Sequence, residues 1–423
     1  MFTDRVLTMD TGDATPKLLT DVPGPSSRAW IDRLAVRECP AITARRSRRA
    51  SALGAVDDDP IVWQEAVGAN VIDVDGNRFV DLTAGFGVAS VGHRHPAVVA
   101  AAKAQLDTLI HVMGDAFPDT NRILLMERLA ELTGLDRSIL GSSGSDGVEA
   151  ALKTGRILSG KDKVLAFTGG YHGLSYGALP VTGYHGDAFR APFTAQLGDH
   201  VVRAEFGGAL PDLSDIGTVL VEPIQGRGGI RVPPAGWLQS LADKARAAGA
   251  VLVFDEVYTG FGRTGDWFAF QHEGVRPDIL VLGKGMAGGF PISAAVGTAE
   301  AMDAWGASQG EALHTQTFLG HPVGCAMALA TITLLEEIVP NINGTSDWIR
   351  GLLEERGYTV RGRGLMLGIE LENTLALSRS LMRKGFIVLP AGEEAEVLGL
   401  TPPLTIADAQ LMAFIDALDS VTE

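Results

Sequence analysis

The sequence predicts an α/β protein whose main sheet is mostly parallel and covered by helices on both faces. Between about residues 121 and 320, short apolar runs of strand length alternate with amphipathic helical patterns such as residues 236–248. Apart from the first residues of two of them, Lys163 and Thr218, the strand candidates are apolar throughout, which is typical of parallel strands buried on both faces. These candidates are Lys163–Phe167, Thr218–Val221, Val251–Phe254 and Ile279–Leu282.

The N-terminal part of the chain has a different pattern. Residues 61–81 alternate apolar and polar side chains around Asp75-Gly76-Asn77, a turn signal that predicts a small β-meander. A helix is predicted over residues 97–109, after His95-Pro96, and a further candidate helix covers residues 27–38.

The C-terminal part again mixes strands and helices. Residues 360–371 read as a strand pair or a bent strand, and 386–390 as a further strand. Helical patterns cover residues 378–385 and 407–418. The change of pattern indicates a separate α+β part at this end of the chain.

The composition excludes several classes of partner. The chain holds 35 Lys and Arg against 51 Asp and Glu, a formal net charge of −16, which argues against nucleic-acid binding. The N-terminus lacks the apolar core of a signal peptide, and no stretch is expected to span a membrane. Only two cysteines are present, Cys39 and Cys325, so we expect a cytoplasmic protein. No metal site is predicted, because the histidines lack metal-ligand spacing.

Two charged residues are predicted at one edge of the sheet. Lys284 follows the apolar run Ile279–Leu282, and Asp255 ends the run Val251–Phe254. Carboxyl ends of parallel strands meet at one edge, so both side chains can face one ligand. A partly buried lysine has a lowered pKa and can capture a carbonyl, while an aspartate can keep a pyridine nitrogen protonated. Pyridoxal phosphate needs both groups. A solvent-reaching lysine and a turn-capping aspartate remain the alternatives.

Two loops supply further candidate contacts for such a cofactor. Residues 141–153, GSSGSDGVEAALK, form a Gly/Ser loop that runs into a helical pattern. Free backbone N–H groups at a helix start suit a phosphate, although Ser-Asp is also an ordinary N-cap. After the strand ending at Phe167, two glycines precede Tyr171 and His172. An aromatic ring there can stack on a planar cofactor, but could equally be a packing residue.

Together these segments resemble the class III, or omega-type, pyridoxal-phosphate-dependent aminotransferases of fold type I, over roughly residues 63–406. The resemblance implies a large domain, residues 86–325, with a mostly parallel seven-stranded sheet covered by helices. It implies a small α+β domain built from residues 1–85 and 326–423. It also implies pyridoxal 5'-phosphate bound covalently to Lys284, and a homodimer with shared active sites.

The resemblance also assigns roles to individual residues. The matching segments are GSDGVEAALK, YHG, VEPIQGRGG, DEV, PDILVLGKG and HTQTFLGHP. Lys284 and Asp255 would be the catalytic residues. The implied phosphate contacts are Gly144 and Ser145, together with Thr317, which would reach the phosphate of the neighbouring subunit. Around the cofactor ring, the resemblance implies Tyr171 as the stacking ring, followed by His172, and Val257 against the other ring face. It further implies Glu222 near the phenolic oxygen, Asp255 at the ring nitrogen, and Lys284 as the residue bound to the cofactor.

The sequence departs from the family pattern in the expected substrate pocket. Arg227 stands where many relatives that use glutamate carry Glu, and Gly399 stands where they carry Arg, so the usual carboxylate clamp is in doubt. Arg227 could bind a carboxylate from the opposite wall, or turn to solvent or to a neighbouring acid. Tyr258 stands where relatives often have Gln, and Phe86 falls at a pocket position.

The implied activity is an aminotransferase that moves an amino group from an amine or (omega-)amino acid to a 2-oxo acid, with pyruvate expected, by a ping-pong mechanism. The alternative is a racemase, epimerase or aminomutase of the same family, since these share the lysine, the aspartate and the phosphate loop. A cofactor-binding protein without catalysis is a third class, against which Lys284 argues. A nicotinamide-dependent dehydrogenase is disfavoured, because no GxGxxG follows an early strand.

Overall fold

The computed structural model describes residues 11–43 and 60–422. Its centre is a seven-stranded sheet in the order β4-β10-β9-β8-β7-β5-β6. Only β10 runs antiparallel to its neighbours, so the expectation of a mostly parallel seven-stranded sheet is confirmed. The strands are β4 (Arg137–Gly141), β5 (Lys163–Phe167), β6 (Val201–Ala204), β7 (Ile216–Val221), β8 (Val251–Asp255), β9 (Ile279–Leu282) and β10 (Ser293–Gly297).

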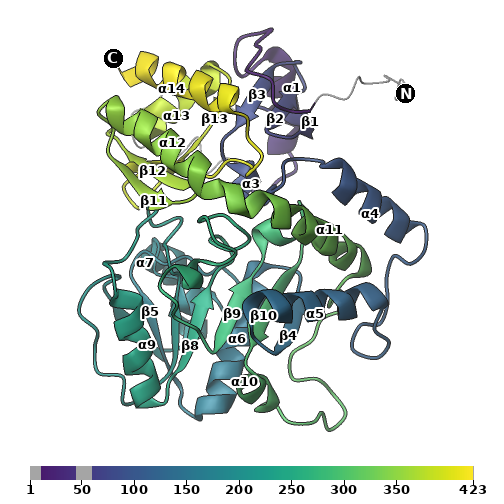
Figure 1. Cartoon of the computed structure of the whole chain (residues 1–423), viewed down its shortest axis with the longest axis vertical. Helices are drawn as coiled ribbons and strands as arrows, with labels where there is room; N and C mark the ends of the chain where they lie inside the picture. Colours follow the sequence, from purple (N-terminus) through teal and green to yellow (C-terminus); the bar gives the residue numbers. More distant parts are fainter. Residues whose placement is uncertain (1–10, 44–59, 423) are drawn as a thin grey trace.

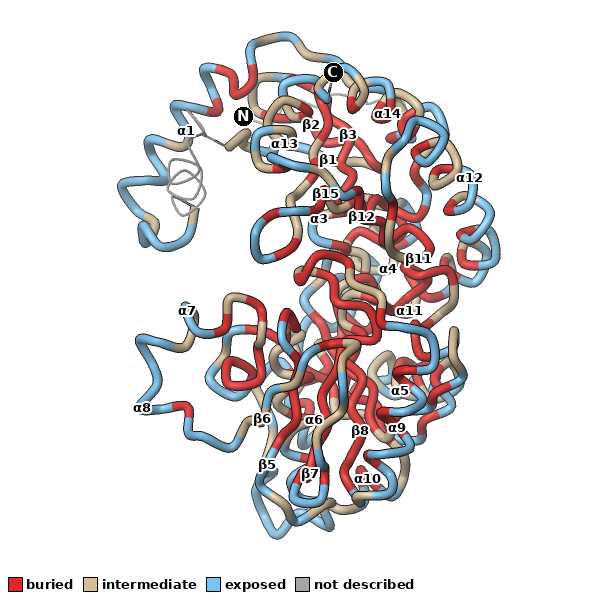
Figure 2. Tube along the Cα trace, turned by 90° about the vertical axis from the view of Figure 1, so that its left-hand side faces the viewer, coloured by how far each residue is buried: buried red, intermediate tan, exposed pale blue. Residues whose placement is uncertain are grey.

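Helices cover both faces of this sheet (Figure 1). Alternate residues of β8 enter different apolar clusters, with Leu252 and Phe254 in one and Val253 in the other. The first cluster includes residues of α9 (Trp237–Ala248), and the second includes residues of α6 (Gly144–Ser159). The buried trace runs through the strands in Figure 2, as expected for a sheet without a solvent-facing side.

Both ends of the chain build the upper part of the molecule in Figure 1. The N-terminal meander is confirmed and takes its fourth strand from the C-terminal part, because β13 pairs with β3. A second sheet has the order β11-β12-β15-β14. The strands are β1 (Trp63–Val67), β2 (Asn70–Asp73), β3 (Arg78–Asp81), β11 (Val360–Arg363), β12 (Met366–Glu370), β13 (Phe386–Ile387), β14 (Leu389–Ala391) and β15 (Val397–Leu400).

The predicted helices exist with shifted ends. The candidate at residues 27–38 is α1 (Pro25–Ala35), and the one after His95 is α4 (Pro96–Leu106). The two C-terminal candidates are α13 (Thr374–Arg383) and α14 (Asp408–Thr422). The remaining helices are α3 (Ala84–Gly87), α5 (Thr120–Thr133), α7 (Gly186–Arg190), α8 (Thr194–Leu197), α10 (Ala299–Asp303), α11 (Pro322–Ile338) and α12 (Ile342–Glu355).

One helical stretch is apolar for its length. Among the described residues, Pro322–Glu355 is long and apolar enough to cross a membrane by length and composition alone, and it consists of α11 and α12 with a short 3₁₀ turn between them. The expectation that no stretch spans a membrane stays a prediction. Half of the most apolar window of Pro322–Glu355 is buried inside the protein, and α11 packs against α4 and α5. Its apolar character therefore fits a core helix that lies between the upper and lower parts of the molecule in Figure 1.

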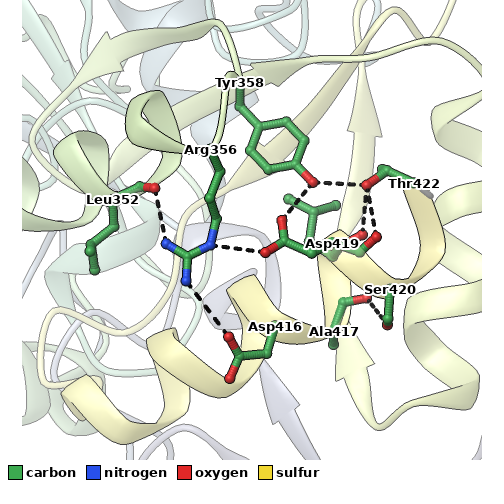
Figure 3. Close-up of polar contacts among 9 residues, drawn as sticks. Leu352, Arg356, Tyr358, Asp416, Ala417, Asp419, Ser420 and Thr422 are labelled. Carbon is green, nitrogen blue, oxygen red and sulfur yellow. Dashed lines mark hydrogen bonds and ion pairs between the residues drawn. The ribbon is translucent and has the colours of Figure 1, made fainter.

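The C-terminal helix is fixed by a polar network (Figure 3). Arg356, which directly follows α12, donates from Nε to Asp419 Oδ2 over 2.9 Å. The Tyr358 hydroxyl donates to the other oxygen of Asp419, also over 2.9 Å. The pair is partly exposed, so its net contribution to stability is small, but it ties α14 to the C-terminal end of α12.

Candidate active site

Four parallel strands deliver polar side chains to one edge of the sheet. Tyr171 and His172 lie in the loop after β5, and Glu222 directly follows β7. Asp255 is the last residue of β8, and Lys284 lies two residues after the end of β9. The carboxyl ends of parallel strands are where such sheets bind ligands. The structure thus brings these five residues to one edge of the sheet, although Tyr171 and Lys284 are more than 110 positions apart in the sequence.

Asp255 and His172 form a buried pair. Asp255 is 4% exposed and His172 is 3% exposed, and Asp255 Oδ2 lies 2.7 Å from His172 Nδ1. Asp255 Oδ1 accepts from the Val257 backbone N–H over 3.0 Å. Burial lowers the pKa of His172, but the hydrogen bond and the charge of Asp255 outweigh it, so the pKa is raised. The histidine therefore fixes the orientation of the carboxylate.

Glu222 is a second buried carboxyl group at the same edge. Its Oε2 accepts from the Tyr171 N–H over 2.9 Å, and its Oε1 accepts from the Gly226 N–H over 3.3 Å. Burial raises the pKa of Glu222 to about 7. The group can therefore be either protonated or charged near neutral pH, depending on what lies beside it.

Lys284 is held in an unusual backbone conformation. Its φ angle is 29°, in the left-handed region that non-glycine residues rarely adopt. Burial lowers the pKa of the Lys284 amine to about 8, an effect that the nearby charges of Asp255 and Glu222 oppose and that of Arg227 supports. Strain and a lowered pKa at one lysine are typical of a functional amine.

The loop before α6 is fixed by its own side chains. Asp146 Oδ2 accepts from the N–H groups of Ser142 and Ser143, each over 3.0 Å, and Ser143 caps the helix. Burial alone would raise the pKa of Asp146, but these hydrogen bonds outweigh it and lower the pKa. Within the described part of the chain, the N–H groups of Gly144 and Ser145 donate to no protein acceptor. Both point from a helix start, where an anion binds readily.

Glycines bring this loop close to the other site residues. A Cβ at Gly144 would lie 3.1 Å from Val257 Cγ1, and a Cβ at Gly283 would lie 3.4 Å from the same atom. A Cβ at Gly173 would overlap the Ser145 hydroxyl. Val257 and the helix start therefore lie next to the strand end that carries Lys284.

The Arg227 side chain packs over two aromatic rings, so it is not directed only at solvent. Its guanidinium carbon is 4.4 Å from the centroid of the Tyr171 ring and 5.1 Å from that of Tyr184. No carboxylate of the described residues forms an ion pair with it, so the alternative of a neighbouring acid has no support. The Gly392 N–H donates to the Arg227 carbonyl over 2.9 Å, which fixes the loop against the C-terminal part.

The other pocket candidates are placed as follows. The Tyr258 ring faces Lys284, with 3.8 Å between Nζ and the ring centroid. Phe86 is 47% exposed and has a left-handed φ of 68°. At Gly399, an added Cβ would lie 3.3 Å from the Leu389 carbonyl oxygen and 3.5 Å from Ile230 Cδ1.

Thr317 is exposed, in a segment that lies beside the loop before α6 of its own chain. Ser142 Oγ donates to Gln316 Oε1 over 2.7 Å, and Gln316 Nε2 donates to Asp146 over 3.2 Å. Sequence reasoning missed Gln316, although it lies within the quoted segment HTQTFLGHP. It also missed Tyr184, for which the sequence carries no local signal. Among the described residues, no group of three or more His, Cys, Asp or Glu could hold a metal ion.

Comparison with known proteins agrees with this geometry. The family model "Aminotransferase class-III" matches residues 53–422. Acetylornithine aminotransferase of Mycobacterium tuberculosis is 38% identical over 395 residues, which cover 90% of this chain and 96% of the relative. Acetylornithine aminotransferase of Methanosarcina acetivorans is 34% identical over 370 residues, covering 85% of this chain and 91% of the relative.

Solved structures give the same result. An (S)-enantioselective omega-transaminase from Thermomicrobium roseum superposes with a TM-score of 0.81 at 29% identity, covering 94% of this chain and 98% of that structure. A pyridoxal-phosphate-bound amine transaminase from an uncultivated Pseudomonas species superposes with a TM-score of 0.77 at 28% identity, covering 86% of this chain and 94% of that structure. The chain belongs to the class III aminotransferases, which depend on pyridoxal phosphate.

Proposed function

We propose that the protein transfers an amino group from an amine or ω-amino acid to a small 2-oxo acid, pyruvate in particular, by a ping-pong mechanism. The observation that carries the proposal is the placement of Asp255 and Lys284 at the ends of adjoining parallel strands. A racemase, epimerase or aminomutase of the same family would use the same residues. Release of a carbonyl product from the donor alone, before any acceptor is added, separates the two activities.

The residues of the site fit pyridoxal phosphate. Gly144 and Ser145 offer N–H groups at a helix start that no acceptor among the described residues takes up, and Asp255 offers a buried carboxylate for the ring nitrogen. When bound, the cofactor supplies an electron sink for the pair left when the donor carbon loses its proton. Lys284 is the residue that would hold the cofactor covalently. Its pKa of about 8 leaves part of the freed amine neutral near pH 7.5, so Nζ can take up that proton.

The surroundings of Arg227 support a small carboxylate substrate. The guanidinium lies over Tyr171, the expected stacking ring, and has no ion-pair partner within the described ranges. Gly399 carries no cation, and no other arginine lies between residues 392 and 423. A buried carboxylate without a partner is costly, so a second carboxylate, as in 2-oxoglutarate, would be poorly accommodated. A monocarboxylate such as pyruvate would be satisfied by Arg227 alone.

Replacing Arg227 by Ala is expected to raise KM for pyruvate about 10- to 100-fold, since a hydrogen bond to a charged group is lost. The rate with a neutral amine donor should change little. Steady-state kinetics with each substrate varied in turn measures both effects. Arg231→Ala is the matched control, because that arginine lies in the same loop but pairs with Glu205 over 3.0 Å. Unchanged pyruvate KM in Arg227→Ala, or efficient use of 2-oxoglutarate by the parent enzyme, would contradict the proposal.

The names of the relatives make N-acetylornithine a second candidate donor, because several curated relatives are acetylornithine aminotransferases. A donor panel of N-acetylornithine, ornithine and a simple primary amine, each with pyruvate and with 2-oxoglutarate, separates the possibilities. We expect an ω-amine donor to be accepted, and pyruvate to be the better acceptor of the two.

We propose a cytoplasmic homodimer in which Thr317 completes the phosphate site of the partner. Two segments, residues 109–117 and 313–318, expose large apolar side chains near Thr317. The segments are in contact, since the ring centroids of His111 and Phe318 lie 5.5 Å apart. Exposed apolar surface of this kind is typical of an interface. Its members are Leu109, Ile110, Met113, Phe117, Leu313 and Phe318.

Phe117→Glu is therefore expected to dissociate the protein and abolish most of its activity, because a charge would enter the apolar contact. Analytical ultracentrifugation combined with activity measurement across a dilution series checks this. Trp348→Glu, at an exposed tryptophan of α12, is the control and should leave mass and activity unchanged. Full activity in a protein that sediments as a monomer would overturn the shared site.

A further inference from the structure

Tyr258 is fixed from three directions. Its hydroxyl lies 3.1 Å from Thr401 Oγ1, which donates to the Thr83 carbonyl over 3.2 Å. A Cβ at Gly87 would press on one edge of the ring, and a Cβ at Gly226 would press on the opposite edge. Only glycine lets both backbones approach this closely. The ring therefore has little freedom to tilt or flip, and one of its faces is presented to the site.

That face meets the amine of Lys284. Nζ lies 3.8 Å from the ring centroid, well within the range of a cation–π interaction. The charged groups facing Lys284 are Asp255, Glu222 and Arg227. Yet no hydrogen bond or ion pair joins any of them to Nζ in the part of the chain that the structure describes. The aromatic face is thus the closest partner that favours a protonated amine.

We propose that Tyr258 is a positioning residue for Lys284, whose free ammonium is held against the Tyr258 ring face. Lys284 is free before it binds the cofactor and again whenever the donor has replaced it. A lysine that has taken a proton from the donor carbon is a cation, so the ring stabilises it in place until the proton is passed on. Tyr258 touches the amine through its ring, and its hydroxyl serves as an anchor to Thr401.

The test titrates Lys284 directly in the full-length protein freed of cofactor. Competitive acetylation by acetic anhydride across pH 6–10, read by peptide mass spectrometry, gives the pKa of Lys284. Tyr258→Phe keeps the π face, whereas 3,4,5-trifluorophenylalanine at position 258 keeps the shape and removes most of the negative potential of the face. Lys153, an exposed lysine of α6, is the internal control within each sample.

A ring face that stabilises the ammonium form raises the pKa of Lys284. Reducing the negative potential of that face must therefore lower the pKa. We expect the Phe variant to titrate like the parent and the trifluoro variant to titrate about one pH unit lower. At pH 7 the neutral fraction of Lys284 would then rise about fivefold, and capture of pyridoxal phosphate would quicken accordingly. Identical titration of all three proteins would overturn the proposal, and so would a Phe variant that shifts as far as the trifluoro variant.

The labelling experiment needs neither a donor nor an oxo acid. A wrong substrate assignment would leave the titration of Lys284 unaffected, and an unchanged titration would leave the proposed transamination standing. The two ideas can therefore fail separately.

Discussion

Lys284→Ala is expected to lose transaminase turnover by about 10⁴-fold or more, because the amine proposed to bind the cofactor and to move the proton would be removed. The variant should still fold, since Lys284 lies outside the strands and is not part of the apolar core. Turnover of a donor with pyruvate, measured with saturating added cofactor, quantifies the loss. Added methylamine should restore a small part of it, because an external amine can replace the missing base.

Lys153→Ala provides the comparison for this result. Lys153 lies on α6, near the candidate phosphate loop, and its amine donates to the Leu313 carbonyl over 3.2 Å. It should retain nearly full activity. Comparable losses in the two variants would show that general damage to this part of the molecule, and not a specific amine, explains the effect.

Asp255→Ala is expected to reduce turnover by about 10²- to 10⁴-fold while leaving much of the cofactor bound. The proposed phosphate site at the start of α6 does not include Asp255, so it should still hold the cofactor. The carboxylate proposed to keep the ring nitrogen protonated would be gone, and His172 would lose its 2.7 Å partner. Cofactor content per subunit and the rate of the half-reaction with donor alone measure the two effects separately.

The neighbouring carboxyl group gives a matched control for Asp255. Glu256 is also fully buried, but its oxygens accept from the N–H groups of Ala269 and Phe270 over 2.6 and 2.8 Å. Glu256→Gln should therefore affect stability more than the chemical step. Near-normal turnover in Asp255→Ala would remove Asp255 from the ring-nitrogen role.

The sheet could be predicted where its strands are uniformly apolar. β5 and β9 match the prediction residue for residue, because continuous apolar runs bounded by polar residues have few alternatives. The antiparallel strand β10, SAAVG, was missed because small residues give little strand signal. Residues 386–390 were expected as one strand, but β13 and β14 belong to different sheets. That division depends on partners far away in the chain, which local pattern does not reveal.

For the site, too, some residues could be placed from the sequence and others could not. The positions of Asp255 and Lys284 could be predicted because Asp255 ends a strand, Lys284 follows one, and parallel strand ends meet at one edge. The position of Arg227 over Tyr171 and Tyr184 depends on two loops meeting in space, so the sequence left its role open. The link from Tyr258 to Thr401 spans 143 positions and joins the sheet edge to the C-terminal part, which no local pattern could indicate.

The basic run at residues 44–49 and the extreme N-terminus lie outside the described residues. For the basic run, a solvated face or loop, and not a binding patch, stays the prediction from the sequence.

The most direct test of the central claim is to find where the cofactor is attached. The purified protein is treated with borohydride, digested, and mapped by mass spectrometry for the reduced pyridoxyl-phosphate adduct. We predict a single adduct on Lys284, at the end of β9 and facing Asp255. An adduct on Lys153 or any other lysine would contradict the assignment of this sheet edge as the catalytic centre.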